Sequence, residues 1–303
     1  MQIKNVFIIG AGALGLMYAS YLQDYLKDEV YFIADEDRVK KYKNMDYIIN
    51  GEKYNFNFVC DKENEQKADL IIFAVKFTGM DEAIKSVKNF VKDDTIFLSV
   101  MNGIESENII KEHYGEKHLL YCEVHGMDAQ KENNNVSFSK VGTICYGNKD
   151  NIITEDVKKV EELFINSNLP YEIPDNILHN LWSKLMLNDA VNQVVAVYET
   201  TYGGIQKQGK PREMVINVMK EVQKVAKAEG IELTDIEIND WMALMDTLSP
   251  DNAPSLRQDT KAKRKTEVEL FAGTIKKLGK KHNIETPLND YLYDKIKEIE
   301  NSY

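Results

Sequence analysis

The sequence predicts an α/β domain followed by an all-α domain, that is, a doubly wound parallel sheet and then a bundle of helices. Up to about Ser167, short β-branched or aromatic runs alternate with amphipathic stretches of helical length, which is the pattern of βαβ units. Beyond that point strand patterns nearly vanish, and long segments with a helical period follow. The segment N-L-P-Y-E-I-P-D-N brings two prolines close together between the two patterns, so we expect domains at 1–168 and 169–303.

The predicted strands of the first domain are short apolar runs, and the predicted helices are the amphipathic segments between them. We expect strands at Ile3–Ile9, Glu29–Ala34, Leu70–Val75 and Thr95–Val100, and further strands with a polar hairpin at E-N-N-N within Leu119–Gly147. We expect helices at 13–27, 37–44, 80–91, 105–113 and 154–167 in this domain, and at 176–198, 211–229, 235–247, 257–281 and 287–301 in the second.

The composition describes a globular protein and excludes several classes of partner. A chain of 303 residues that is 43% hydrophobic is long enough to fill a core in each of two domains. Its net charge of -11 would repel phosphate backbones and anionic bilayers, so we expect neither a nucleic acid nor a membrane partner. The three cysteines lack C-x-x-C spacing, and the N-terminus shows neither a secretion signal nor a membrane span. We therefore expect a cytoplasmic protein without a disulfide framework or a zinc site.

The first chemical motif is a glycine-rich turn between a strand and a helix, G-A-G-A-L-G at residues 10–15. Gly10 suits a tight turn, Gly12 lets the backbone approach a pyrophosphate, and Gly15 lets the helix pack on the strand. A glycine-rich turn without a ligand is the alternative, but the strand before it and the helix after it favour a Rossmann-type dinucleotide loop. The remaining residues of this loop are Ala11, Ala13 and Leu14.

A carboxylate follows the second predicted strand at the spacing expected for a ribose contact. Asp35 lies twenty residues beyond Gly15, where it can accept hydrogen bonds from the adenosine ribose hydroxyls, which favours NADH. Arg38, Lys40 and Lys41 follow directly and could neutralise the 2′-phosphate of NADPH instead. Both cofactors stay open at this point.

Two more predicted strands end in polar residues, at the edge of the sheet where α/β proteins bind ligands. Lys76 ends A-D-L-I-I-F-A-V-K, and Asn102 follows the next strand in S-V-M-N-G-I. The alternatives are a surface lysine and an ordinary Asn-Gly turn. With the glycine loop, both residues become candidate cofactor contacts.

An apolar helix at the start of the second domain carries a polar stripe. Lys184, Asn188 and Asn192 follow one another at intervals of four, so they lie on one side of a helix that is otherwise rich in leucine and valine. Apolar neighbours lower the pKa of a lysine toward neutrality, where it donates a proton efficiently, and amides orient a carboxylate or hydroxyl. The alternative is a lysine whose stem covers apolar surface beside amides that cap buried backbone. Beside a dinucleotide loop, the stripe indicates the reduction of an α-keto acid with Lys184 as general acid.

Three further polar residues of the second domain are candidates for the same site. Asn252 and Ser255 lie in the proline-bounded turn S-P-D-N-A-P-S-L-R-Q-D, where Ser255 could equally cap a helix. Glu267 lies in R-K-T-E-V-E-L-F-A-G and could be either a carboxylate of the site or a solvated acid.

With these motifs taken together, the chain resembles the ketopantoate reductase (2-dehydropantoate 2-reductase) family along nearly its whole length. The resemblance rests on G-A-G-A-L-G, the strand-ending V-K, N-G, L-W-S-K-L-x-x-N-x-x-x-N, S-L-R-Q-D, and K-T-E followed by F-A-G. It implies a Rossmann domain, a C-terminal helical domain, and NADPH-dependent reduction of the C2 ketone of 2-dehydropantoate to (R)-pantoate, on the route to pantothenate and coenzyme A.

The resemblance also implies roles for individual residues. The family's proton donor corresponds to Lys184, and the residues that hold the nicotinamide end of the cofactor correspond to Asn102 and Glu267. Lys76 corresponds to a lysine that lines the cleft between the family's two domains. Its substrate contacts correspond to Asn188, Asn192, Asn252 and Ser255.

The chain departs from the family pattern at two positions. Asp35 stands where many relatives have an arginine for the 2′-phosphate, and Tyr202 stands where a further substrate-side asparagine is expected. The choice between NADH and NADPH therefore stays open, and the substrate could also be another branched 2-oxo acid. A dinucleotide-sensing regulator is the alternative from another class, and the large apolar content of the helical domain is compatible with a homodimer.

Overall fold

The computed structural model describes residues 2–43, 45–63 and 66–303, which form two units. Unit 1 consists of the chain up to Asn102 together with Ser106–Ile177, and unit 2 consists of Gly103–Glu105 and Leu178–Tyr303. The chain stays in unit 1 beyond residue 168 because the short strand β12 (Tyr171–Glu172) pairs with the edge of its sheet.

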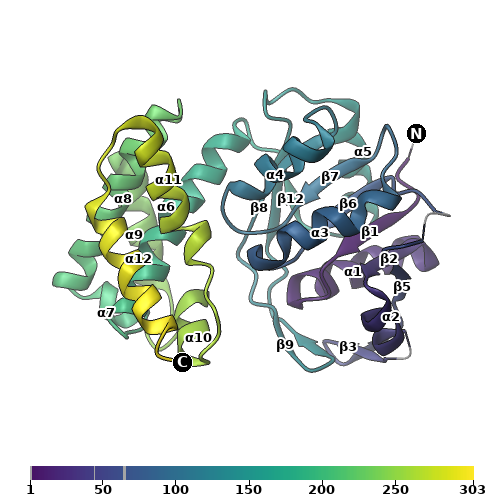
Figure 1. Ribbon diagram of the computed structural model, residues 1–303, viewed down its shortest axis with the longest axis horizontal. Coiled ribbons are helices and arrows are strands. Elements are labelled where there is room, and N and C mark those ends of the chain that lie inside the picture. Colours follow the sequence, from purple (N-terminus) through teal and green to yellow (C-terminus); the bar gives the residue numbers. More distant parts are fainter. Residues whose placement is uncertain (1, 44, 64–65) are drawn as a thin grey trace. The chain divides into compact units, whose positions relative to one another are not determined.

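The core of unit 1 is an 8-stranded sheet with the order β12-β11-β8-β7-β6-β1-β2-β5 (Figure 1). The strands from β5 to β8 pair in parallel, and β11 pairs antiparallel with β8. The predicted parallel sheet is therefore confirmed, with strands one to three residues shorter than expected. The bounds are β1 (Val6–Ile9), β2 (Val30–Ala34), β5 (Asn57–Cys60), β6 (Leu70–Phe73), β7 (Ile96–Ser99), β8 (Leu119–His125) and β11 (Thr143–Gly147).

Helices cover both faces of this sheet, so its central strands are buried and apolar on both sides. On one face, side chains of α1 (Ala13–Leu26) and α5 (Glu155–Asn166) join the hydrophobic core. On the other face lie α3 (Met80–Val87) and α4 (Glu105–Tyr114), and Figure 1 shows α3 passing in front of the strands. The rings of Phe97 on β7 and Tyr114 on α4 stack at 5.0 Å between centroids.

Unit 1 also contains a 4-stranded sheet, which was only partly expected. Its order is β4 (Glu52–Tyr54), β3 (Tyr47–Ile49), β10 (Asn135–Ser137), β9 (Gln130–Glu132). The predicted E-N-N-N hairpin is confirmed as β9–β10. The hairpin β3–β4 turns at Asn50 and Gly51, which both have positive φ. Asn-Gly is a common hairpin turn, but no hairpin was predicted at this position. The helix expected at 37–44 is α2 (Glu36–Tyr42), and residue 44 lies outside the described residues.

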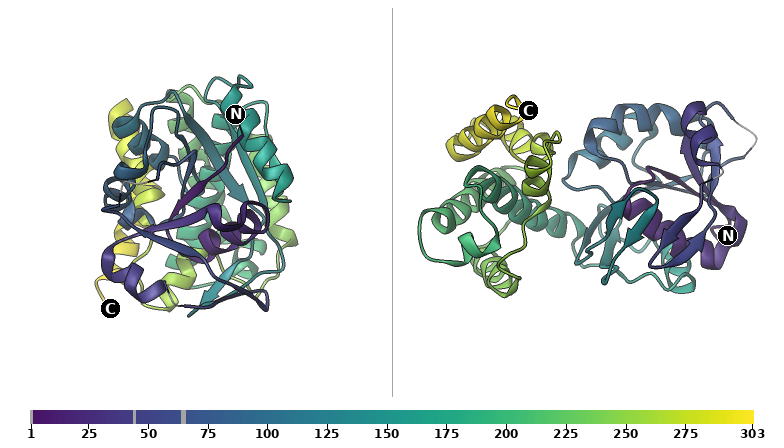
Figure 2. Two further views of the ribbon diagram at one scale, coloured as in Figure 1. Left: turned by 90° about the vertical axis from the view of Figure 1, so that its right-hand side faces the viewer. Right: turned by 90° about the horizontal axis from the view of Figure 1, so that it is seen from below.

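Unit 2 is helical, as predicted, and Figures 1 and 2 show its helices packed beside one another. Helix α9 begins with a capping box, in which the Thr234 and Glu237 side chains bond each other's backbone N–H groups. Across the described residues, we find no helix with the length and apolar character that a membrane span requires. The bounds are α6 (Ile177–Val197), α7 (Tyr202–Gln206), α8 (Lys210–Ala228), α9 (Asp235–Thr247), α10 (Ser255–Lys261), α11 (Ala272–His282) and α12 (Pro287–Glu300).

The prediction of a single helix at 257–281 is wrong, because the chain forms two helices, α10 and α11, with an irregular segment between them. Lys263 has a left-handed φ of 51°, which ends the first helix. The backbone N–H and the hydroxyl of Thr266 both donate to a carboxylate oxygen of Glu300, at 2.7 Å each. These two hydrogen bonds to a residue of α12 hold the irregular segment between α10 and α11 in place. No local sequence pattern predicts them, because Glu300 is far from Thr266 in the chain.

Helix α6 is buried around most of its circumference and carries a fully buried acid, Asp189. Gln193 Nε2 donates to its Oδ1 at 2.8 Å. Burial, and then the nearby carboxylate of Glu221, raises the pKa of Asp189 well above its ordinary value of 3.8. Glu221 itself accepts from the backbone N–H groups of Leu288 and Asn289 and so caps α12. An acid is thus held in a place that favours its neutral form.

Asp189 should make the stability of the protein depend on pH. Its pKa is higher in the folded than in the unfolded chain, so the folded state binds more protons above about pH 4, and the free energy of unfolding falls as pH rises toward the folded-state pKa. We expect Asp189→Asn to raise the free energy of unfolding at pH 8 by about 1 kcal/mol or more, because each pKa unit corresponds to about 1.4 kcal/mol. Urea titrations from pH 5 to pH 9 would measure this. The exposed Asp240→Asn is the control, and an unchanged pH slope in Asp189→Asn would contradict the prediction.

Candidate functional site

The glycine loop of unit 1 is built by close packing between β1, β6 and α1. Gly10 has φ of +112°, and a side chain there would collide with the backbone of Ala74 at the end of β6. A side chain on Gly15 would collide with the Gly10 carbonyl. Both glycines are therefore required by the fold itself.

Gly12 is different, because the fold leaves room for a side chain at this position. A Cβ atom there would approach nothing nearer than the Ala74 carbonyl oxygen, at 3.9 Å, and φ is an ordinary −79°. Gly12 is the exposed N-cap of α1, whose first turn begins Ala13-Leu14-Gly15 and contains no acidic residue. The N–H groups of this first turn lack helical partners and, with the helix dipole, favour an anion.

Three predicted polar residues follow strands that neighbour β1 in the sheet. Asp35 follows β2, Lys76 lies three residues beyond β6, and Asn102 lies three residues beyond β7. Because these strands are parallel, their carboxyl ends share one edge with the glycine loop. Lys76 is exposed and Asn102 is half-buried. Unit 1 thus brings Gly10–Gly15 and these three residues together along one edge.

Asp35 also has a structural task, because it caps α2. Its Oδ1 accepts from the Arg38 backbone N–H at 2.8 Å, and its Oδ2 lies 3.3 Å from Arg38 Nε. The Asp35 side chain remains 37% exposed, so one carboxylate can cap the helix and still meet a ligand.

One basic residue that no sequence pattern indicated lies against the loop. Lys131 on β9 donates from Nζ to the Ala11 carbonyl at 2.6 Å. Partial desolvation, and then the neighbouring ammonium of Lys41, lowers the pKa of Lys131. Lys131 therefore lies against the loop that has the anion-binding N–H groups, and the Lys41 ammonium is close enough to Lys131 to affect its pKa. No local signal marks Lys131, because the pairing of β10 with β3 brings its hairpin to the loop.

In unit 2, the polar stripe of α6 has the spacing that was predicted, but its members differ in surroundings. Lys184 and Asn188 are half-buried, while Asn192 is 4% exposed. Asn192 Oδ1 accepts from the Ser255 hydroxyl and from the Leu256 backbone N–H, both at 3.1 Å. Its Nδ2 donates to the Asn188 carbonyl at 3.0 Å. Asn192 therefore joins α6 to the start of α10 and holds Ser255 in place.

The turn before α10 is exposed at Asn252 and is fastened to α7 by backbone hydrogen bonds. The Asn252 carbonyl accepts from the Tyr202 N–H at 2.9 Å, and burial raises the pKa of the Tyr202 phenol. Glu267 is half-buried and precedes the short turn Val268–Leu270. In the same unit, Gly103 packs against Leu270, where a Cβ atom added to the glycine would lie 3.3 Å from the leucine Cδ2. Unit 2 thus contains the other candidate residues, with Asn192 and Ser255 in direct contact.

These two groups of residues define a class of protein: a Rossmann-type unit with an intact dinucleotide loop, joined to a helical unit with a lysine and amides on one helix. Two family models match the chain, "Ketopantoate reductase PanE/ApbA" over residues 6–151 and "Ketopantoate reductase PanE/ApbA C terminal" over residues 176–300. The chain belongs to the ketopantoate reductase family, an oxidoreductase family.

A relative matches nearly the whole chain, and two solved structures share its fold. A 2-dehydropantoate 2-reductase of Pyrococcus horikoshii is 29% identical, with 98% of this chain and 97% of the relative covered. The dimeric ketopantoate reductase of Staphylococcus aureus shares the fold with a TM-score of 0.83 at 21% identity, over 98% of this chain and 99% of the other. A D-mandelate dehydrogenase with NADH and anilino(oxo)acetate shares it with a TM-score of 0.86 at 24% identity, over the same shares.

The glycines give a test that separates folding from ligand binding. We expect Gly15→Ala to destabilise the protein by about 1–3 kcal/mol, the usual cost of overpacking. Gly12→Ala should leave the melting temperature near that of the wild type but weaken dinucleotide binding at least tenfold, because its methyl group would occupy the space of the pyrophosphate. Thermal melts and fluorescence titrations with NADH and NADPH measure both effects. Wild-type affinity in a folded Gly12→Ala variant would show that no phosphate approaches this backbone.

Proposed function

We propose that the protein is a 2-dehydropantoate 2-reductase, which reduces the C2 ketone of 2-dehydropantoate to (R)-pantoate with a nicotinamide dinucleotide. The observation that carries the proposal is the half-buried Lys184 with its amides on α6, in a chain of this family whose Rossmann-type unit has an intact dinucleotide loop. We assign cofactor binding to the Rossmann-type domain, predicted at 1–168 and extending to Ile177 in the structure, and substrate binding to the helical domain predicted at 169–303.

In the proposed reaction Lys184 is the general acid. The reduced nicotinamide, when bound, supplies the hydride. The Lys184 ammonium polarises the ketone oxygen and donates its proton to the alkoxide that forms there, which leaves a neutral amine that regains a proton from water. The Asn188 amide and the Asn252 and Ser255 side chains are assigned to the carboxylate and hydroxyl of the substrate. Asn192 is a positioning residue, since its Oδ1 already holds Ser255.

The proposed cofactor site uses the backbone N–H groups of the glycine loop for the pyrophosphate, with Lys131 adding a positive charge beside Ala11. Lys76, Asn102 and Glu267 are assigned to the nicotinamide half. We propose that NADH is preferred over NADPH. The Asp35 carboxylate lies at the end of β2, where it would repel a 2′-phosphate, and the charge of Arg38 is compensated by its ion pair with Asp35.

A second candidate function is reduction of another 2-oxo acid. Two observations favour keeping it: Tyr202 replaces an expected asparagine beside Asn252, and the D-mandelate dehydrogenase structure with the same fold contains NADH and an oxo acid. A panel of 2-oxo acids that includes 2-dehydropantoate, assayed with both cofactors, decides between the candidates. The first proposal requires that 2-dehydropantoate have the highest kcat/KM, and a protein that binds cofactor but reduces nothing would be a sensor.

The dimeric Staphylococcus aureus reductase supports a homodimer for this chain as well.

Replacement of Lys184 should remove the chemical step and spare the cofactor site. We expect Lys184→Ala to lower kcat by about 100-fold or more, the usual contribution of a general acid, with unchanged dinucleotide affinity. Lys184→Arg should be similarly slow, because arginine keeps the charge but does not give up its proton. Stopped-flow measurement of NADH oxidation tests this, with the exposed Lys220→Ala on α8 as control. Turnover near the wild-type rate in Lys184→Ala would contradict the role.

The charge of Asp35 should set the choice between NADH and NADPH. We expect Asp35→Asn to raise the ratio of kcat/KM for NADPH to that for NADH by about tenfold, or 1.4 kcal/mol, because the repulsion of the 2′-phosphate is lost. Asparagine caps a helix as well as aspartate does, so α2 should stay intact, as circular dichroism can verify. Asp35→Arg should shift the ratio further. An unchanged ratio in both variants would mean that Asp35 acts only as a helix cap.

A further inference from the structure

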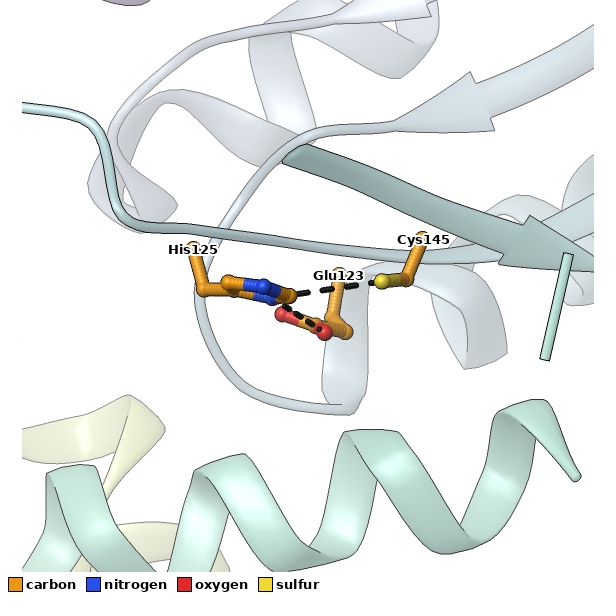
Figure 3. Close-up of side chains that lie close together, drawn as sticks. All are labelled: Glu123, His125 and Cys145. Carbon is orange, nitrogen blue, oxygen red and sulfur yellow. Dashed lines mark hydrogen bonds and ion pairs between the residues drawn. The ribbon is translucent and has the colours of Figure 1, made fainter. Parts of the chain in front are cut away.

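The edge of the unit 1 sheet carries a row of metal-ligating side chains that the proposed reaction does not use. Glu123 on β8 pairs directly with Cys145 on β11, and Cys145 pairs in turn with Glu172 on β12. His125 lies two residues beyond Glu123 and therefore points to the same side of the sheet. Figure 3 shows the Glu123, His125 and Cys145 side chains converging on one point from two neighbouring strands.

The ligating atoms of these side chains lie close enough together for one metal ion to bridge them after small side-chain movements. His125 Nδ1 lies 2.9 Å from Glu123 Oε1 and 3.9 Å from Cys145 Sγ, and the three ligand atoms all lie within 4.8 Å of one another. Glu172 Oε2 lies 3.8 Å from Cys145 Sγ. Around a tetrahedral zinc ion, nitrogen, oxygen and sulfur ligands are about 3.3–3.6 Å apart, given the usual metal–ligand bond lengths. Since the three atoms lie within 4.8 Å, side-chain movements of about 1 Å would bring them to these distances, and Glu172 would turn toward the ion from its place beside Cys145.

Burial at the cluster suits a bound ion with one side open to solvent. Glu123 and Cys145 are buried, at 4% and 0% exposure, while His125 and Glu172 are exposed. Thiolate, imidazole and carboxylate together are the donor set of Zn²⁺ rather than of Mg²⁺ or Ca²⁺, which take oxygen ligands.

We propose that Glu123, His125, Cys145 and Glu172 bind one Zn²⁺ ion at this sheet edge. The ion would fasten β12, which has only two residues, to β8 and β11 just before the chain leaves unit 1 at Ile177. Cysteine spacing in the sequence indicated no zinc site, because the ligands come from three separate strands. The alternative is a cluster of hydrogen bonds among the same side chains that has no affinity for metal.

Zinc binding by the purified full-length protein tests the proposal directly. The protein is stripped with a chelator under reducing conditions and titrated with Zn²⁺ alone, in competition with a chromophoric chelator and without dinucleotide or substrate. We expect one equivalent to bind with a dissociation constant below about 1 μM, and Cys145→Ser and Glu123→Gln to weaken binding by about 100-fold. Glu172→Gln should weaken it by about tenfold. The half-buried Cys60→Ser and the exposed His113→Asn should bind as the wild type does.

Cobalt gives a second readout that reports the thiolate ligand. Co²⁺ in place of Zn²⁺ should produce a thiolate-to-cobalt absorption band that Cys145→Ser abolishes and Cys60→Ser retains. His125→Asn changes an exposed residue, so it keeps the test valid if a buried variant fails to fold by circular dichroism. Absence of stoichiometric binding, or equal binding by wild type and the His125, Glu123 and Cys145 variants, would overturn the proposal. Because the measurement needs no turnover, it stands or falls independently of the reductase assignment.

Discussion

The close approach between Gly15 of α1 and the turn at Gly10 determines where the other residues of the proposed cofactor site lie. A side chain at either position would run into backbone, at Gly10 or at Ala74. With both glycines present, α1 can begin directly at the carboxyl edge of β1, and its unpartnered N–H groups open onto that edge. The polar residues after β2, β6 and β7 reach the same edge because those strands run parallel to β1.

In unit 2, α6 shows how polar groups are kept in a helix that is buried on nearly every side. Asn192 bonds the start of α10, and Asp189 is favoured in its neutral form, so burial is offset by a partner in one case and by a changed protonation state in the other. The Asn192 amide also shows that a structural and a functional interpretation of one residue can both hold. By capping α10 it fixes Ser255, so a bond that is purely structural for the helix also positions a residue assigned to the substrate.

The parts of the fold that the sequence predicted are those with local signals. Strand, glycine turn and helix follow one another within residues 6–26, so hydrophobic pattern and glycine spacing are sufficient there. The break between α10 and α11 depends on Glu300, and the position of Lys131 depends on a hairpin that pairs with β3. Neither is visible in a window of sequence, because each depends on a contact between residues far apart in the chain. For the same reason, the spacing predicted that Asn192 lies on the same side of the helix as Lys184 and Asn188, but it did not predict the bond to Ser255.

The net charge of the protein and the local charge at the glycine loop act on an anionic cofactor in opposite directions. A net charge of -11 repels a dinucleotide at long range, yet this repulsion is screened beyond about 8–10 Å at physiological ionic strength. Close to the loop, the helix N-terminus has no acidic residue in its first turn, and Lys131 with Lys41 supplies positive charge. Desolvation, and then repulsion from Lys41, lowers the pKa of Lys131, and an anion beside the two ammonium groups would relieve the repulsion. Local charge at the loop, rather than the sign of the whole molecule, therefore decides whether the anionic cofactor binds.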